Sequence, residues 1–103
     1  MKLMIILAIE EHTKQVWKLL REEGVPVYSE TDIYGFNTEE HKPDISNWFA
    51  HTHQERFSKL FFSIQTEDAV KRVLEAVKKH NEEHKNAKNY PLHAYQLNVE
   101  ASA

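Results

Sequence analysis

The chain opens with an apolar run of strand length, and no other feature constrains the fold as much. Residues Lys2–Ile9 read KLMIILAI. Alternate side chains of a strand point to opposite faces, so this strand is apolar on both faces. Such a strand has to be covered on both sides. We therefore expect it inside a sheet, between two covering layers.

The rest of the chain alternates between helical and strand periodicity. Gly24 suits the left-handed position that follows a helix, and Thr66 suits the N-cap position that precedes one. The expected elements after the first strand are a helix at Glu11–Glu23, strands at Val27–Phe36 and Phe57–Gln65, a helix from Glu67 to His84 and a strand at Pro91–Glu100. This order predicts one α+β domain over residues 1–103. Its fold is ferredoxin-like, βαββαβ, with a four-stranded antiparallel sheet and both helices on one face.

Two helices can cover only one face of a four-stranded sheet. On the other face we expect further apolar side chains of the first and third strands; in the third strand Leu60, Phe62 and Ile64 share one face and Phe61 lies on the other. Water does not favour an exposed surface of this kind. Another copy of the chain is the economical cover, so we expect self-association.

A stretch without periodicity separates the second and third strands. Residues 37–56 read NTEEHKPDISNWFAHTHQER. Connections longer than about 12–15 residues are uncommon in compact domains, and they are usually functional or disordered. This one is mostly polar but holds Trp48 and Phe49, and aromatic side chains dominate interface hot spots. We expect a loop that binds a protein partner through these two rings. The alternative is that they fold back onto the body or a neighbouring subunit.

The composition excludes several classes of function. The net charge is −3 and no basic patch with interleaved aromatics occurs, so we expect no nucleic-acid partner. There is no cysteine, hence no disulfide framework and no thiolate metal site. The apolar run at the start is too short to span a membrane. We expect a cytoplasmic protein that does not insert into a membrane.

Histidine is abundant, with seven residues in the chain. His41, His51 and His53 lie in the 37–56 segment together with carboxylates, and this mixture suits a divalent transition metal such as zinc, copper or nickel. We name these three as candidate metal ligands, with a solvated polar loop as the alternative. His80 and His84 fit the H-x-x-E-H pattern, which is typical of the inverted zinc proteases. They also extend the apolar stripe of their helix, so we expect a structural role for that pair.

Residues 22–36, EEGVPVYSETDIYGF, resemble the PII signalling family. That family has a first helix ending in Gly-Val and a Gly-Phe pair at the mouth of its long T-loop. Gly24 with Val25 and Gly35 with Phe36 occupy these places here, and the second half of the chain fits the same layout. The resemblance implies a homotrimer whose sheets face the three-fold axis. It also implies a T-loop-like segment at 37–56 that controls a protein partner, such as an enzyme or a membrane transporter.

The resemblance implies an effector site at the base of the loop, where we name Gly35, Phe36 and Asn37. It does not carry tight ATP binding with it. PII proteins usually have a glycine in the place of Asn37, and they hold phosphates with glycines and basic residues after the second helix. Residues 80–90 here contain no glycine, and the chain ends in EASA without basic residues. Backbone amides approach phosphates closely where glycine permits it.

Three functions stay open. The first is a non-catalytic regulatory sensor that responds to a ligand or a metal. The second is a small protein for divalent-metal handling, similar in role to the CutA family, which shares the fold. The third is a dimeric α+β-barrel enzyme, which would need a buried ligand pocket. Glu30 and Asp32 share a strand face without an accompanying nucleophile, so we do not expect an enzyme.

Overall fold

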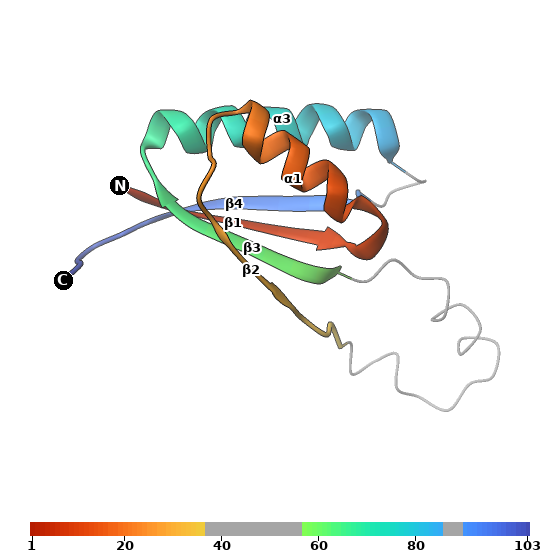
Figure 1. Cartoon of the computed structure of the whole chain (residues 1–103), viewed down its shortest axis with the longest axis horizontal. Coiled ribbons are helices and arrows are strands. Elements are labelled where there is room, and N and C mark those ends of the chain that lie inside the picture. Colours follow the sequence, from red (N-terminus) through yellow and green to blue (C-terminus); the bar gives the residue numbers. More distant parts are fainter. Residues whose placement is uncertain (37–56, 86–89) are drawn as a thin grey trace.

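The computed structural model describes residues 1–36, 57–85 and 90–103. They form a four-stranded antiparallel sheet of order β2-β3-β1-β4, with α1 and α3 on one face (Figure 1). The elements are β1 (Lys2–Ile9), a 3-10 turn η1 (Glu10–His12), α1 (Thr13–Glu22), β2 (Ser29–Asp32), β3 (Phe57–Gln65), α3 (Glu67–His84) and β4 (Leu92–Asn98). The predicted ferredoxin-like α+β fold is confirmed. No helix in the described ranges is long and apolar enough to cross a membrane.

Two local sequence signals set helix boundaries as predicted. Gly24 has a φ of 81°, and the N–H groups of Gly24 and Val25 donate to carbonyls of the last turn of α1. This pattern is a Schellman motif. Thr66 Oγ1 accepts a hydrogen bond from the Ala69 N–H at 3.2 Å, which makes Thr66 the N-cap of α3.

The second strand is shorter than its alternating sequence predicts. β2 covers only Ser29–Asp32, not Val27–Phe36, and pairs with Phe62 to Lys59 of β3. Beyond Asp32 the strand pairing with β3 ends, and Tyr34 is 83% exposed. The carbonyl of Val27 instead accepts a hydrogen bond from Ser63 Oγ at 2.8 Å. Smaller differences are that η1 precedes the first helix and that β4 ends two residues before Glu100.

The core lies between the two helices and the sheet. Asn81 fastens α3 to the edge strand β4, because its side-chain amide donates to the Leu92 carbonyl at 2.8 Å and its oxygen accepts from the Leu92 N–H at 3.1 Å. The buried cluster consists of Met4, Ile6, Ala8, Val16, Leu19, Leu20, Val25, Phe61, Ala69, Val70, Val73, Val77 and Leu92.

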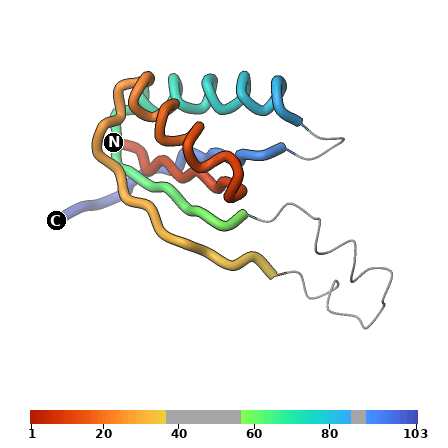
Figure 2. Tube along the Cα trace, turned by 45° about the vertical axis from the view of Figure 1, so that its right-hand side comes forward, coloured from red at the N-terminus to blue at the C-terminus, as the bar shows by residue number. Residues whose placement is uncertain are grey.

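The opposite face of the sheet carries the second apolar set of β1, as predicted. Strand pairing sets Ile5 of β1 opposite both Phe62 of β3 and Tyr95 of β4. Leu3 in the same way lies opposite Ile64 and Leu97. The side chains of Phe62, Ile64, Tyr95 and Leu97 are between 41% and 48% exposed. Figure 2 shows both helices on the other side of the sheet, so neither α1 nor α3 covers this apolar face.

Candidate functional site

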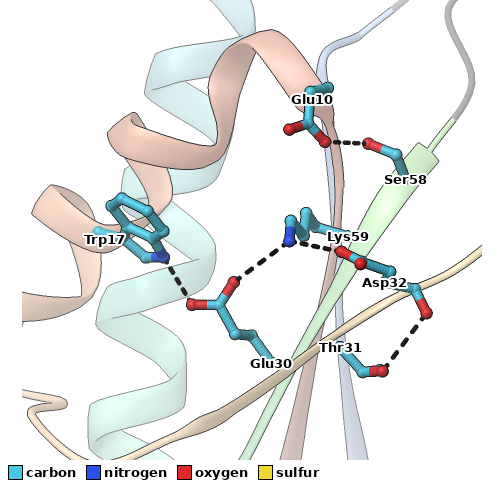
Figure 3. Close-up of polar contacts among 7 residues, drawn as sticks. All are labelled: Glu10, Trp17, Glu30, Thr31, Asp32, Ser58 and Lys59. Carbon is cyan, nitrogen blue, oxygen red and sulfur yellow. Dashed lines mark hydrogen bonds and ion pairs between the residues drawn. The ribbon is translucent and has the colours of Figure 1, made fainter.

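The described ends of the chain on either side of residues 37–56 lie at one corner of the sheet, where β2 leads in and β3 leads out (Figure 1). The Ile33 N–H donates to the Ser58 carbonyl at 2.9 Å, which holds the two strands together past the last pair of β2. Polar side chains from η1, α1, β2 and β3 gather here (Figure 3). We name this set the loop-base cluster; it consists of Glu10, Trp17, Glu30, Asp32, Ser58 and Lys59.

Lys59 is the centre of the loop-base cluster. Its ammonium group is hydrogen-bonded to Asp32 and lies 3.9 Å from Glu30 Oε2. The hydrogen bond to Asp32 raises the pKa of Lys59 above its ordinary value. Trp17 Nε1–H donates to Glu30 Oε1 at 2.9 Å (Figure 3). Glu30 therefore connects helix α1 to the strand pair that borders residues 37–56.

Strand register brings these groups together. Asp32 pairs with Lys59 across the two strands, and residues directly opposite in an antiparallel pair share a face. Lys59 in turn pairs with the buried Ala8 of β1, so this face is the one that the helices cover. Trp17 has the helical spacing of the buried residues Thr13 and Leu20 of α1, yet it is 41% exposed and its indole N–H donates to Glu30.

The loop-base cluster has more acidic than basic groups. Three carboxylates, Glu10, Glu30 and Asp32, lie around the single ammonium of Lys59. Ser58 Oγ–H donates to Glu10 Oε2 at 3.1 Å. An arriving phosphate would meet repulsion and would have to displace a carboxylate from Lys59. The arrangement suits a neutral or cationic group better than an anion.

A groove with a volume of about 720 Å³ lies between α3 and β4, at the sheet edge away from the loop-base cluster. Its lining includes Glu67, Asp68 and Glu75 together with Lys71 and Lys78. Acidic and basic side chains are mixed along the groove, and the acidic ones are in the majority among these five. These five groups therefore do not form a binding site for an anion.

The predicted effector residues Gly35 and Phe36 follow β2 at the same corner, and both are exposed. Among the described residues, a Cβ added at Gly35 would meet the Phe57 carbonyl oxygen at 3.9 Å, an ordinary van der Waals contact. Space alone does not demand glycine there. The other predicted site residues lie outside the described ranges: Asn37, His41, Trp48, Phe49, His51 and His53.

A second group of titratable side chains lies at the end of α3. His80 and His84 stack with ring centroids 4.1 Å apart. His12 of η1 joins them, with its Nδ1 2.8 Å from His80 Nε2. The sequence pattern pointed to His80 and His84 but not to His12, because no local spacing connects residues 68 positions apart. We name these three residues the histidine cluster.

The histidine cluster keeps His80 neutral. The pKa of His80 is lowered from 6.5 to about 4, chiefly by burial and then by the neighbouring His84 and His12, against an opposing effect of Glu83. A neutral imidazole has one protonated nitrogen and one nitrogen with a lone pair. His80 can therefore accept a hydrogen bond or bind a metal at neutral pH.

No family model and no curated protein matches this chain, but solved structures do. A PII-like signalling protein from Thermus thermophilus superposes with a TM-score of 0.63 at 20% identity, over 95% of this chain and 84% of that one. CPII, a nitrogen regulatory PII-like protein from Thiomonas intermedia, gives a TM-score of 0.56 at 19% identity, over 99% and 93%. The chain has the PII-like fold. The apo form of CPII supports the same assignment, with a TM-score of 0.51 at 23% identity over 93% and 88%.

The PII-like fold gives the loop-base cluster its context. The CPII structure of 19% identity contains ADP, AMP and bicarbonate. In this chain, the corner between β2 and β3 carries carboxylates around Lys59. The scaffold is shared, and the chemistry of this corner is a property of the chain's own residues.

Proposed function

We propose that this PII-like protein is a non-catalytic cytoplasmic regulator that assembles as a homotrimer. The observation that carries the proposal is the apolar sheet face, which a single chain leaves half exposed in a fold shared with PII-like signalling proteins. Closed symmetric assembly is the usual way for a soluble chain to cover such a face. The resemblance of residues 22–36 to the PII family favours three subunits.

The proposed output is residues 37–56, with Trp48 and Phe49 as anchors for a protein partner such as a transporter or an enzyme. Burial of an aromatic side chain contributes roughly 1.5–3 kcal/mol relative to exposure, so these two rings favour a covering surface. The proposed effector position is the loop base, at Gly35, Phe36 and Asn37. A ligand there changes the partner's access only if it binds one arrangement of the segment better than another.

The charges around Lys59 bear on the class of effector. Because Asp32 and Glu30 already engage its ammonium group, an anionic effector would lose the cation that it needs. We therefore propose a neutral or cationic effector at this corner, with tight ATP binding excluded from the function.

The test is the double substitution Trp48→Ala with Phe49→Ala in the full chain. We expect light scattering to report an unchanged trimer, an unchanged melting temperature and loss of the partner in a pull-down from the source cells. Tyr34→Ala, which removes an aromatic ring that is 83% exposed beside the segment, is the matched control and should retain the partner. A broken trimer or a large fall in melting temperature would show that the two rings belong to the core or a subunit interface.

A further inference from the structure

The histidine cluster brings three imidazole rings from two separate elements into contact. The ring centroid of His12 lies 5.0 Å from that of His80 and 5.5 Å from that of His84, at interplanar angles of 82° in both cases. His80 and His84 are one helical turn apart and stack at 20°. Two histidines at this spacing share a helix face and can bind one metal ion.

The contacts within the cluster fix where lone pairs lie. The 2.8 Å between His12 Nδ1 and His80 Nε2 requires that one of these nitrogens carries a proton and donates a hydrogen bond to the lone pair of the other. His84 Nδ1 lies 2.9 Å from the His80 carbonyl oxygen, and a carbonyl only accepts, so Nδ1 carries the proton. In the neutral ring of His84, Nε2 then holds the lone pair.

We propose that His12 and His80 bind a divalent copper or nickel ion, with His84 as the third ligand. Two ligands at 90° with metal–nitrogen bonds of about 2.0 Å have nitrogens about 2.8 Å apart, whereas tetrahedral zinc separates them by about 3.3 Å. In the metal-free protein, the 2.8 Å between His12 Nδ1 and His80 Nε2 is a hydrogen-bond distance, and it is also close to the separation of the 90° case. Copper(II) and nickel(II) are the ions that prefer such tetragonal geometry with nitrogen ligands.

Metal binding rearranges protons without a net loss. Before binding, one proton lies between His12 Nδ1 and His80 Nε2. When both nitrogens bind the ion, that proton moves to the other nitrogen of its own ring, so both imidazoles stay neutral. Within residues 1–36, 57–85 and 90–103, no three histidine, aspartate or glutamate side chains already converge on one centre. His84 therefore has to rotate toward the pair to complete the site.

The surroundings of the histidine cluster allow a cation to enter. Burial, His84 and His12 oppose positive charge on His80, and Glu83 acts in the direction that favours it. A groove of about 380 Å³ between α1 and α3 is lined by His80 and His84, among other residues. An entry path and a defined ligand set are the requirements for a metal site. The proposed site does not depend on the trimer, on the partner or on the loop histidines.

The experiment titrates copper(II) chloride into the full-length protein in a non-coordinating buffer, followed by calorimetry and electron paramagnetic resonance. We expect one ion per chain. His12→Asn and His80→Asn, made separately, should each weaken binding at least tenfold. Two controls should leave it unchanged: His93→Asn, which removes an imidazole packed on Phe57, and the triple change His41→Ala, His51→Ala and His53→Ala.

Two outcomes would overturn the site. Loss of copper only in the triple variant would assign the metal to the 37–56 segment. If His12→Asn and His80→Asn leave the copper affinity unchanged, or if the wild type binds no copper, the contact of His12 with His80 is a hydrogen bond and not a metal site. If those two variants fail to fold, pulsed electron paramagnetic resonance on the copper-loaded triple variant still tests the site. Coupling of the copper spin to the nitrogens of two or more imidazoles supports the site, and coupling to fewer contradicts it.

Discussion

The two glycines of the chain differ in whether the backbone requires glycine at their position. Gly24 has a φ of 81° and closes the Schellman motif after α1, whereas a Cβ at Gly35 would make an ordinary van der Waals contact with the Phe57 carbonyl oxygen at 3.9 Å. A left-handed conformation costs a residue with a side chain about 1–2 kcal/mol. The first glycine is therefore required by the backbone, and the second is available for function.

We expect Gly24→Ala to lower the free energy of unfolding by about 1–2 kcal/mol, and Gly35→Ala to leave it unchanged. Urea unfolding of both variants at one protein concentration measures the difference. Equal losses in the two variants would contradict the assignment of Gly35 to a position without steric demand.

His80 makes stability depend on pH in the metal-free protein. Its pKa falls from 6.5 to about 4 on folding, so between these values the unfolded chain binds a proton that the folded chain does not. The unfolded state then gains protons as the pH falls, and stability is lost from about pH 6.5 downward. Above pH 6.5 the contribution of the neutral ring is fully present.

We expect the free energy of unfolding to fall by about 1 kcal/mol between pH 7 and pH 5 through His80, after allowance for solvent screening of a partly exposed ring. Urea unfolding at both pH values, in the presence of a chelator, measures it. His80→Asn should flatten the dependence, while His93→Asn should not. If the free energy of unfolding depends on pH equally in both variants, His80 is not the cause of the dependence.

At the scale of elements, helix ends and strand pairs decide what can bind. The α3–β4 connection begins after His84, in the part of the chain where residues 80–90 contain no glycine. The corner between β2 and β3 offers Lys59, which Asp32 and Glu30 already engage. Backbone amides approach phosphate groups closely where glycine permits it, and the first place has no glycine. In the second place, Lys59 is a cation that is already engaged within the chain.

Calorimetric titration with ATP, with and without magnesium, should therefore detect no binding tighter than about 1 mM, which corresponds to roughly −4 kcal/mol. Lys59→Ala should leave this result as it is, because its ammonium group is engaged within the chain. Micromolar affinity in the wild type would mean that residues beyond these two places bind the nucleotide.

The bounds of helices and strands could be predicted where they depend on neighbouring residues in the sequence. Side-chain contacts between distant parts of the chain could not be predicted. The ends of α1 and α3 depend on Gly24 and Thr66, each of which acts within five residues of its own position. β1 and β3 have the bounds that their apolar patterns predict. The contact of His12 with His80 spans 68 positions, and the bond from Trp17 to Glu30 depends on how α1 lies over the strands. No periodicity encodes either contact, so the sequence predicted the scaffold and missed both.

At the scale of the molecule, the sheet face decides the assembly. We expect light scattering to report a trimer for the wild type and a monomer for Phe62→Asp, because a carboxylate in that face would be buried without a partner. Tyr34→Asp, which introduces the same charge at an exposed position off that face, should remain trimeric. A wild-type monomer stable at micromolar concentration would contradict the proposal, and a dimer would favour the α+β-barrel enzyme.

The half-exposed face also affects the fate of a newly made chain. A subunit that has met no other copy displays Phe62, Ile64 and Leu97 to water. Chaperones and proteases act on chains that expose apolar surface, and such chains aggregate as their concentration rises. Subunits that are synthesised faster than they assemble would then be degraded, so the cell would hold little of the unassembled form. The side chains that favour association would in this way also limit the lifetime of any subunit that stays alone.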